Sequence, residues 1–456
     1  MKTKFLLISL LAFFWANAQD GSLDVSFNSA GPDTGDLYAT AIDANNKIYV
    51  GGNFTSYDGV PVEYIARLNS NGALDNTFSP SSYSTIDYPS GIKILTDNEI
   101  LMFGNTYNSS TGVYHSFCRK YLTNGAFNVT FETNAFSLFN AFTAQLANVH
   151  DVLELSSGKL LVSYSNYNGS GSSGLYTSYD NKIIRLNADG TLDNSFNVVT
   201  LNEPATDIEY FMGTNILVAG RFSTVNGVST SKLFKMNENG IIDATFTHNL
   251  SSLINNAKIV VRPDNSIVYA DGTTITTLNS SGVVQTTESV SSTYNCIYHS
   301  ELNMTVVTGN NTGFKRITNT NSVDSGFNIG TGPNTNIRDL AKTSTNNYII
   351  VGQFTSYNGT PVNKIARIIG NTTLSSNHFE QNNFSLYPNP VENQFTISSN
   401  NNEEIKTIEI YNLQGQLVKT ESNLNIISTE NLTPGFYLAK LTSYDGKEAN
   451  LKFLKK

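Results

Sequence analysis

Two copies of one phrase, far apart in the chain, decide the fold. Residues 51–69 read GGNFTSYDGVPVEYIARLN, and residues 351–369 read VGQFTSYNGTPVNKIARII. Phe54 and Phe354 occupy the same place in the two copies and lie 300 residues apart (354 − 54). A phrase that returns at such a distance indicates a repeat array with further copies between its ends.

A second phrase marks each repeat. It reads GSLDVSF, GALDNTF, GAFNVTF, GTLDNSF and GIIDATF at residues 21–27, 72–78, 125–131, 190–196 and 240–246. Weaker versions are GVVQTT at residues 282–287 and NSVDSGF at residues 321–327. The Asp or its equivalent stands at positions 24, 75, 128, 193, 243, 285 and 324, so the repeats average 50 residues ((324 − 24)/6).

Each repeat reads as four antiparallel strands. In the first repeat these are residues 36–43, 47–57, 64–69 and 73–78, separated by turn pairs such as Asp58-Gly59 and Asn71-Gly72. Four strands in about fifty residues, written about seven times, predict an all-β fold, a seven-bladed β-propeller over residues 19–370. A β-helix would use shorter coils, and a β-sandwich would not repeat its sequence pattern.

The two ends of the array predict how the ring closes. After Gly370 no LDxxF phrase follows, whereas residues 21–27 carry that phrase without a blade of their own. We therefore expect Leu23 and Phe27 to complete the last blade, beside residues 365–369. This pairing would remove two exposed sheet edges.

Residues 1–18 are expected to be a signal peptide. Lys2 and Lys4 precede a short apolar stretch, residues 5–14, which is well below the roughly 20 residues needed to span a bilayer. The predicted cleavage site comprises Ala16, Ala18 and Gln19. No later segment has transmembrane length, so we expect an exported protein without a membrane span.

Residues 384–456 predict a separate small β-sandwich. They follow a polar linker, residues 371–383, and alternate apolar strands with turn pairs such as Gln414-Gly415 and Asp445-Gly446. The expected domains are thus residues 1–18, 19–370, 371–383 and 384–456.

The repeats resemble the delta-60 repeat family, a β-propeller-like repeat of secreted bacterial proteins. The motifs that carry the resemblance are GGNFTSYDG, AGRFSTVNG and VGQFTSYNG, followed by segments such as IARLNSNGALDNTF, within residues 21–370. That family has no established catalytic residues, so the resemblance implies a fold and no particular reaction.

The C-terminal segment resembles the sorting domain of the type IX secretion system. The residues that carry this resemblance are Tyr387, Pro388, Asn389, Pro390, Gly435 and Tyr437, together with the basic tail 452–456. In that family the domain directs a periplasmic protein across the outer membrane and is usually removed there. The resemblance implies the type IX machinery as a partner, and a location at the outer-membrane surface or in the medium, reached through the periplasm.

Charge and composition exclude several function classes. The chain has 28 Lys+Arg against 37 Asp+Glu, a net charge of −9, and no basic cluster, so we expect no nucleic-acid partner. The 5 His are dispersed without metal-ligand spacing, and no cofactor motif occurs, so we expect no metal and no cofactor. Cys118 and Cys296 fall in different repeats and are expected to be buried free thiols.

The candidate catalytic groups favour a scaffold role. Asp residues recur once per repeat at the marker position, which is typical of turn capping rather than of an active site. No G-x-S-x-G motif occurs, so no catalytic residue is predicted. The third repeat is the longest, at 65 residues (193 − 128), and its Gly/Ser-rich loop suggests a contact surface of Tyr167, Tyr176 and Tyr179. The alternative for this loop is a tolerated insertion.

The sequence therefore predicts an exported propeller that binds a polymer, surface glycan or protein without catalysis. One alternative is an extracellular hydrolase of polysaccharide or peptide with its site in the propeller funnel. Another is a purely structural surface component.

Overall fold

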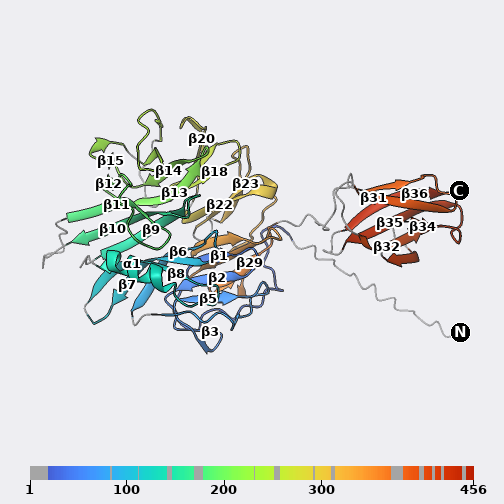
Figure 1. Ribbon diagram of the computed structural model, residues 1–456, viewed down its shortest axis with the longest axis horizontal. Helices are drawn as coiled ribbons and strands as arrows, with labels where there is room; N and C mark the ends of the chain where they lie inside the picture. Colours follow the sequence, from blue (N-terminus) through green and yellow to red (C-terminus); the bar gives the residue numbers. More distant parts are fainter. Residues whose placement is uncertain are drawn as a thin grey trace, which may run out of the picture. The chain divides into compact units, whose positions relative to one another are not determined.

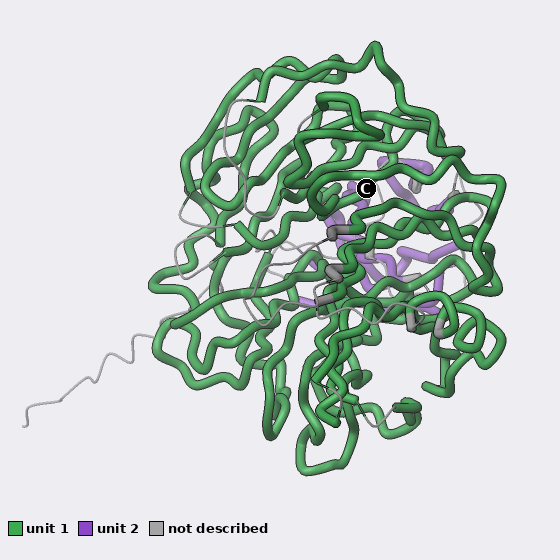
Figure 2. Tube along the Cα trace, turned by 90° about the vertical axis from the view of Figure 1, so that its left-hand side faces the viewer, with its two compact units in different colours: residues 1–371 green, residues 372–456 purple. Residues whose placement is uncertain are grey.

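The computed structural model describes residues 19–456 apart from 83–84, 111, 141–145, 169–177, 231, 251–256, 291–292, 310–313, 371–383, 400–404, 413–415, 423–425 and 444–447. The chain forms two compact units, residues 1–371 and residues 372–456 (Figure 2). Both units consist almost entirely of β-strands (Figure 1). Among the described helices, none is long and apolar enough to cross a membrane.

The first unit is a succession of antiparallel sheets whose strands are mostly adjacent in sequence (Figure 1). In chain order the sheets contain β1 (Leu37–Ile42), β2 (Ile48–Gly52) and β5 (Ile65–Leu68); β6 (Ile86–Ile94), β7 (Ile100–Asn108) and β8 (Val113–Tyr121); β9 (Leu146–Glu154), β10 (Leu160–Asn168) and β11 (Ser178–Leu186); β13 (Ala205–Phe211), β14 (Asn215–Gly220) and β17 (Leu233–Asn237); β18 (Lys258–Val261), β19 (Ile267–Ala270), β20 (Thr274–Leu278) and β21 (Val284–Ser289); β22 (Asn295–His299), β23 (Met304–Thr308) and β24 (Lys315–Ile317); and β25 (Ile337–Lys342), β26 (Tyr348–Gly352) and β29 (Ile365–Ile368).

Several short strands form separate hairpins or extend one of these sheets. Two small hairpins are β3 (Ser56–Tyr57) with β4 (Val60–Pro61), and β27 (Ser356–Tyr357) with β28 (Thr360–Pro361). The sheet of β9–β11 is extended by β12 (Val199–Leu201), β15 (Thr224–Val225) and β16 (Val228–Ser229).

The sheets form a closed circuit. The first strand of each sheet contacts the first strand of the next, in the order β1, β6, β9, β13, β18, β22 and β25, and β25 contacts β1 again. Sheets arranged in a closed circle, each with its first strand innermost, are the architecture of a β-propeller.

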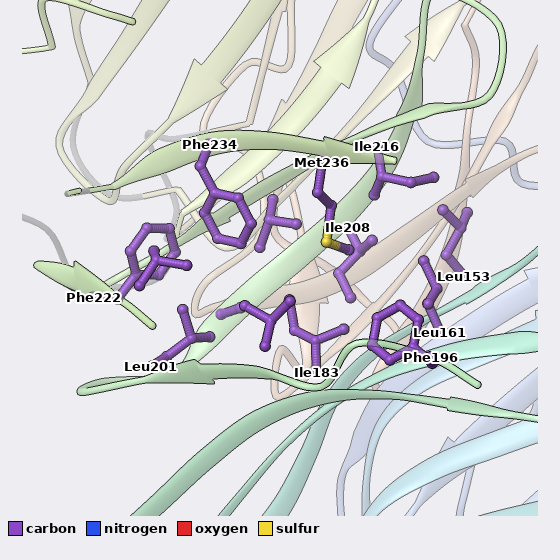
Figure 3. Packing of buried hydrophobic residues seen from close by; sticks show 14 of the residues in the cluster. Leu153, Leu161, Ile183, Phe196, Leu201, Ile208, Ile216, Phe222, Phe234 and Met236 are labelled. Carbon is purple, nitrogen blue, oxygen red and sulfur yellow. The ribbon is translucent and has the colours of Figure 1, made fainter. Parts of the chain in front are cut away.

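The hydrophobic clusters of this unit lie between neighbouring sheets. In the cluster of Figure 3, side chains of β9, β10 and β11 interdigitate with side chains of β13, β14 and β17, among them Leu161, Ile183, Ile208, Ile216 and Met236. The last and first sheets share a cluster in the same way, which joins residues of β26 and β29 to residues of β1, β2 and β5. Because burying each large apolar side chain contributes roughly 1.5–3 kcal/mol, every sheet depends on both of its neighbours.

The predicted closure of the ring is confirmed. Leu23 forms an antiparallel bridge with Ile368 at the outer edge of the last sheet. The Asp24 N–H donates to the Arg367 carbonyl at 2.8 Å, and the Ile369 N–H donates to the Ser22 carbonyl at 2.9 Å. The N-terminal segment therefore supplies the outermost pairing of the last sheet.

The prediction that each repeat contains a fourth strand is wrong for most repeats. In the first repeat the LDxxF phrase makes one bridge, Leu68 with Leu74, and then turns, because Asp75 accepts from the Thr77 N–H through its carboxylate and from the Phe78 N–H through its carbonyl. An Asp side chain that satisfies a nearby backbone N–H competes with sheet pairing. Where the marker is Gln285, β21 continues as a full strand.

One helix departs from the expected all-strand pattern. α1 (Val129–Asn140) begins at the marker position of the second repeat, where Asn128 replaces Asp. The Asn128 side chain accepts from the Phe131 N–H at 3.2 Å, and its carbonyl accepts from the Glu132 N–H at 2.9 Å, which is N-capping geometry. Phe131 and Phe139 are buried against the second and third sheets.

A recurring group of three side chains, which we call the clasp, joins one repeat to the next at four junctions between described residues. In the third repeat Arg185 Nε donates to Asp193 at 2.7 Å, and its guanidinium lies 5.3 Å from the Phe196 ring centroid. Arg185 Nη1 also donates to the Glu238 carbonyl of the following repeat at 2.6 Å. The equivalent clasps are Arg67–Asp75–Phe78, Arg316–Asp324–Phe327 and Arg367–Asp24–Phe27.

The glycine of the turn before each marker makes this junction possible. Gly240 has φ +79°, and a Cβ there would lie 2.1 Å from the Asn197 carbonyl oxygen and 2.9 Å from the Phe196 ring of the preceding repeat. Glycine is required there both by its conformation and by the close approach of the neighbouring repeat.

The second unit contains two antiparallel sheets that share one core. The sheets are β30 (Phe384–Tyr387), β31 (Gln394–Ser399) and β34 (Ile426–Ser428), and β33 (Leu417–Ser422), β32 (Ile405–Asn412), β35 (Gly435–Ser443) and β36 (Glu448–Lys455). The buried residues Phe395, Ile408, Ile410, Leu441 and Phe453 come from both sheets.

The closure predicts that the first residues stabilise the whole ring. Deleting residues 19–28 removes the Leu23 pairing, the Asp24–Arg367 ion pair and the apolar contacts of Leu23 and Phe27. The ring is expected to lose about 5 kcal/mol or more of unfolding free energy, since truncating one buried Leu or Phe alone costs roughly 2–5 kcal/mol. Denaturant unfolding of the purified ring measures the change.

A deletion of residues 384–456 is the matched control, because that segment has its own core. It should leave the unfolding of the ring unchanged. Leu23→Cys with Ile368→Cys tests the pairing directly, since bridge partners of this kind lie about 4.5 Å apart at Cα, within disulfide range. An unchanged midpoint in the N-terminal deletion, or no crosslink, contradicts the closed ring.

The clasp predicts an acid-sensitive contribution to stability. The pKa of Asp193 lies well below its ordinary value because its carboxylate accepts hydrogen bonds from Lys159, at 2.7 Å, and from Ser195 and Arg185. A lowered carboxyl pKa stabilises the fold above the unfolded-state value near 3.9, and this contribution disappears as the pH falls. Asp193→Asn should lower the unfolding free energy by about 1–3 kcal/mol at pH 7, and the difference from wild type should shrink below about pH 4.

Asp58→Asn is the control for this substitution. Asp58 is exposed in a turn at φ +52°, a conformation that Asn tolerates. It should change stability little at any pH. A constant difference between wild type and Asp193→Asn from pH 7 to pH 3 would show that the charge of Asp193 plays no part.

Candidate functional site

The innermost strands surround a polar cavity of about 230 Å³, which we call the channel. Each of these strands has one edge that pairs with the next strand of its sheet and one that faces inward. The polar side chains that line the channel are Tyr38, Thr40, Ser90, Lys93, His150, Asp151, Asp207, Glu209, Lys258, Tyr294, Asn295, Arg338 and Asp339. Every inner strand contributes to it.

Three channel carboxylates bind backbone groups of the next sheet. Asp151 accepts from the Ile208 N–H at 2.9 Å, and Asp207 accepts from the Ile259 N–H at 2.6 Å. Asp339 accepts in the same way from the Thr40 N–H at 2.8 Å. These carboxylates link neighbouring sheets, which is a structural use of their charge.

Two lysines balance this charge. Lys93 lies 2.8 Å from Asp151, and Lys258 lies 2.9 Å from Asp207. Burial alone would raise the pKa of Asp151, but the ammonium groups of Lys93 and Lys258 outweigh it and hold this pKa below its usual range. Burial raises the pKa of Asp339 to about 6, and the hydrogen bonds that it accepts and the charge of Lys258 offset this only in part.

Glu209 differs from the other channel carboxylates. It is half-buried on β13, and burial followed by repulsion from Asp207 raises its pKa to about 8. Within the described part of the chain it makes no ion pair within 4 Å. Near neutral pH Glu209 is therefore largely protonated and has a hydroxyl to donate.

His150 is held as a neutral ring. Asn148 accepts through its carbonyl oxygen from Ser90 at 3.0 Å and from Asn105 at 3.2 Å, so its amide N–H donates to His150 Nδ1 at 3.1 Å. The ring proton then lies on Nε2 and is donated to Ser165 Oγ at 2.7 Å. Burial lowers the pKa of His150 to about 4. In this tautomer His150 cannot accept a proton from Ser165.

A row of tyrosine rings, which we call the tyrosine stripe, leads away from the channel. Tyr38 and Tyr88 have ring centroids 6.2 Å apart, Tyr88 and Tyr114 6.5 Å, and Tyr114 and Tyr107 4.8 Å. All four side chains are half-buried. Tyr38 lines the channel, so the stripe and the channel are continuous.

A local sequence difference produces the stripe. In the repeats that contain GGNFTSYDG, AGRFSTVNG or VGQFTSYNG, the chain folds into a small hairpin whose Phe is buried, as Phe54 and Phe354 are. The second repeat reads GNTYNSSTGVY from residue 104 instead. β7 and β8 therefore continue as a straight pair, with Tyr107 directly opposite Tyr114.

Two of the three tyrosines of the predicted ligand loop lie on strands of the neighbouring sheet. Tyr167 on β10 pairs in register with Tyr179 on β11. Tyr176, and the side chains of Tyr167 and Tyr179, lie outside the described residues. The loop thus stays a prediction.

The predicted sorting residues lie in the second unit. Tyr387 ends β30 and is 53% exposed, and Pro388 and Pro390 follow it. The Asn389 side chain donates to the Lys452 carbonyl at 3.1 Å and accepts from the Leu454 N–H at 3.0 Å. Gly435 begins β35, and the Tyr437 hydroxyl donates to the Thr433 carbonyl at 2.8 Å. The motif is thus anchored to β36 and to the start of β35.

Other sequence expectations concern termini, thiols and metals. Ala16 and Ala18 lie outside the described residues, and Gln19 accepts from the Ser22 N–H at 2.9 Å. Cys118 and Cys296 are free and buried, as predicted, and burial raises the pKa of both thiols. Over the described ranges no group of three or more metal-binding side chains occurs.

Sequence reasoning missed the tyrosine stripe and Glu209. A signal for the stripe was present, because the second repeat lacks the hairpin motif and places two tyrosines around a turn, in TYNSSTGVY. No signal marked Glu209, since its pKa depends on Asp207 and on burial that only the closed ring provides.

Comparison with known families supports both parts of the chain. The model described as "Secretion system C-terminal sorting domain" matches residues 385–456. The model described as "Domain of unknown function (DUF5122) beta-propeller" matches residues 44–78, 155–196, 215–246 and 343–368. The delta-60 repeat is a near-synonym of this second family.

Individual relatives are more distant. The chain is 37% identical over 87 residues to an ulvan lyase of Nonlabens ulvanivorans. The matched stretch covers 18% of this chain and 16% of that protein. Among solved structures, the extracellular domain of BT4673 from B. thetaiotaomicron has a TM-score of 0.44 at 12% identity, over 96% of this chain and 58% of that one. A catalytically inactive virginiamycin B lyase from Staphylococcus aureus, with quinupristin, has a TM-score of 0.44 at 10% identity, over 75% of this chain and 97% of that one.

The family matches confirm the two resemblances found in the sequence. The chain carries DUF5122 β-propeller repeats followed by a type IX C-terminal sorting domain, which indicates export to the cell surface or secretion.

Proposed function

We propose that this protein is an exported, seven-bladed β-propeller that binds an extracellular polymer, surface glycan or protein without catalysing a reaction. Residues 1–18 serve as its signal peptide, residues 19–370 as the ring and residues 371–383 as a linker. Residues 384–456 form a β-sandwich that the type IX machinery recognises through Tyr387–Pro390, Gly435 and Tyr437. The circuit of inner strands, with one inner strand per sheet, supports the blade number.

One observation carries the binding function: the chemically capable groups of the ring are engaged in holding it together. Asp151, Asp207 and Asp339 accept backbone N–H groups of the following sheet. The marker carboxylates Asp75 and Asp193 bind arginine in the clasps, and the marker Asp243 binds Lys235. His150 donates to Ser165 and so cannot activate it. What stays available at the channel is the tyrosine stripe, whose amphipathic rings suit ligand contact.

The alternative function, an extracellular hydrolase, is supported by one specific residue, Glu209. A half-buried carboxyl with a pKa raised to about 8 has the property that a general acid needs at neutral pH. A glycoside hydrolase of the usual kind also needs a second, ionised carboxylate near the first. Asp207 and Asp151 are the nearest candidates, and both are committed to backbone N–H groups and lysines. The binding function is therefore preferred.

A combined assay tests the proposal. The purified ring is screened against immobilised polysaccharides and surface proteins, and the same mixtures are analysed for released reducing ends, unsaturated products and peptides. Retention without turnover is the expected result. Product release that Glu209→Gln abolishes, while the unfolding midpoint is kept, would establish the hydrolase instead.

Passage from the periplasm across the outer membrane is expected to depend on the second unit. Deleting residues 384–456 should leave a folded ring in the periplasm, because the two units have separate cores. Cell fractionation of the producing bacterium, with limited proteolysis to report folding, measures this. The full-length Asp58→Asn protein is the control and should reach the surface or medium normally. Surface delivery of the truncated protein at wild-type levels would contradict the sorting role.

A further inference from the structure

The tyrosine stripe is an exception in the repeat pattern. The buried phenylalanines of the small hairpins, such as Phe54 and Phe354, serve the cores of their own repeats. Tyr107 and Tyr114 continue a straight strand pair instead and keep part of their ring surface exposed. In a ring of similar blades, a single specific site requires a feature that departs from the repeat. The straight β7–β8 pair is such a feature.

The geometry of the stripe suits a chain-like ligand. Successive ring centroids lie 4.8–6.5 Å apart, and neighbouring rings are tilted by 41–47°. Each ring offers an apolar face and a hydroxyl at its tip, a combination that suits a ligand with C–H faces and hydroxyl groups. A row of such rings contacts several successive units of a polymer rather than one small molecule.

A buried polar group lies on the same face of the sheet. Ser116 follows Tyr114 by two residues on β8, so both side chains point to one side. Ser116 Oγ donates to Asn166 Oδ1 of β10 at 3.4 Å. Asn166 is 1% exposed, and its Nδ2 has no hydrogen-bond partner among the described residues. An unpaired buried amide is costly, and a ligand hydroxyl would satisfy it.

The charges around most of the stripe favour a neutral ligand over an acidic one. Arg119 is paired with Asp87 and buried. Arg338 lies over the Tyr294 ring, 5.2 Å from its centroid. Asp36 adds negative charge near Tyr38 and, after burial, raises its pKa. Arg338 is the exception: no carboxylate lies within 4 Å of it among the described residues, and its charge acts on Tyr38 at the channel end of the stripe. Tyr107 and Tyr114, at the other end, have no such cation in the described ion pairs or ring contacts, so a uronate or sulfated polymer lacks there the partner that its charge requires.

We infer that Tyr38, Tyr88, Tyr107 and Tyr114 form the platform on which this protein binds a neutral polysaccharide, with the Asn166 amide as a donor at its base. This inference rests on the proposed binding function and names the ligand class and the site. The polymer lies along the stripe and reaches the channel at Tyr38.

Affinity electrophoresis of the mature full-length protein tests the ligand class. The gels contain laminarin, xylan or galactomannan as neutral polymers, and alginate or ulvan as acidic ones. Retardation by at least one neutral polymer, and by neither acidic one, is expected. Retardation by acidic polymers only, or by no polymer at all, would overturn the inference.

Two matched variants test the site. Tyr107→Ala with Tyr114→Ala should weaken the binding of the retarding polymer by about tenfold or more, equivalent to about 1.4 kcal/mol, when measured by titration calorimetry. Tyr107→Phe with Tyr114→Phe keeps the ring faces and should bind within a few-fold of wild type. Thermal unfolding of both variants reports whether they are folded. Asn166→Ala, which removes the amide donor together with the oxygen that accepts from Ser116, provides a second measurement if the alanine pair is not.

The outcomes separate the site from the function. If the folded alanine pair and Asn166→Ala both bind the neutral polymer as tightly as wild type, the platform is wrong and the binding function stands. If the neutral polymer is degraded during titration, the non-catalytic function is wrong, whether or not the tyrosines hold the polymer.

Discussion

The pairing of the first residues of the ring with its last strand is the constraint on which the structure depends. Each sheet buries its apolar side chains against the sheets on either side, so an open array would expose an apolar face at each end. The Leu23–Ile368 bridge and the Asp24–Arg367 ion pair fasten the two ends together. Asp20 then binds Arg316 at 2.7 Å, next to the point where the chain leaves the ring at Gly370. Because the first strand that is synthesised takes the last place in the ring, the ring can close only after its final repeat has been made.

Closure also explains why the repeated residues offer no chemistry. Each clasp needs its arginine, carboxylate and phenylalanine to join one repeat to the next, and the same contacts recur at the seam between the last and first repeats, where Arg367 Nη1 donates to the Ser70 carbonyl at 2.7 Å. A group with this task cannot be released for catalysis without opening a junction between repeats. Specific function therefore has to come from positions where one repeat departs from the others, and the straight β7–β8 pair of the second repeat is such a position.

The sequence predicted what depends on repetition and missed what depends on side-chain competition. The repeat length, the turn glycines, the buried thiols and the seam at Leu23 were all readable from the residues. The fourth strand was predicted wrongly, because period-two spacing of Leu74 and Phe78 looks like a strand, while Asp75 draws the Thr77 N–H into a turn. The helix after Asn128 was missed, because Asn and Asp cap helices about equally well and the marker residue therefore did not distinguish a cap from the turns of the other repeats. Tyr88 and Tyr114 come from strands that meet only in the folded sheet, so their contact could not be predicted from spacing.

The polar channel follows from the free inner edge of each sheet. An innermost strand pairs on one side only, and its inward N–H groups need acceptors, since an unpaired buried N–H is costly. Asp151, Asp207 and Asp339 provide these acceptors across the junction between sheets. Buried carboxylates in turn need cations, which Lys93 and Lys258 supply. The concentration of charge at the centre is thus a consequence of closing a ring of sheets and is weak support for catalysis. Glu209 alone has no such backbone partner among the described residues, and the hydrolase alternative therefore depends on Glu209.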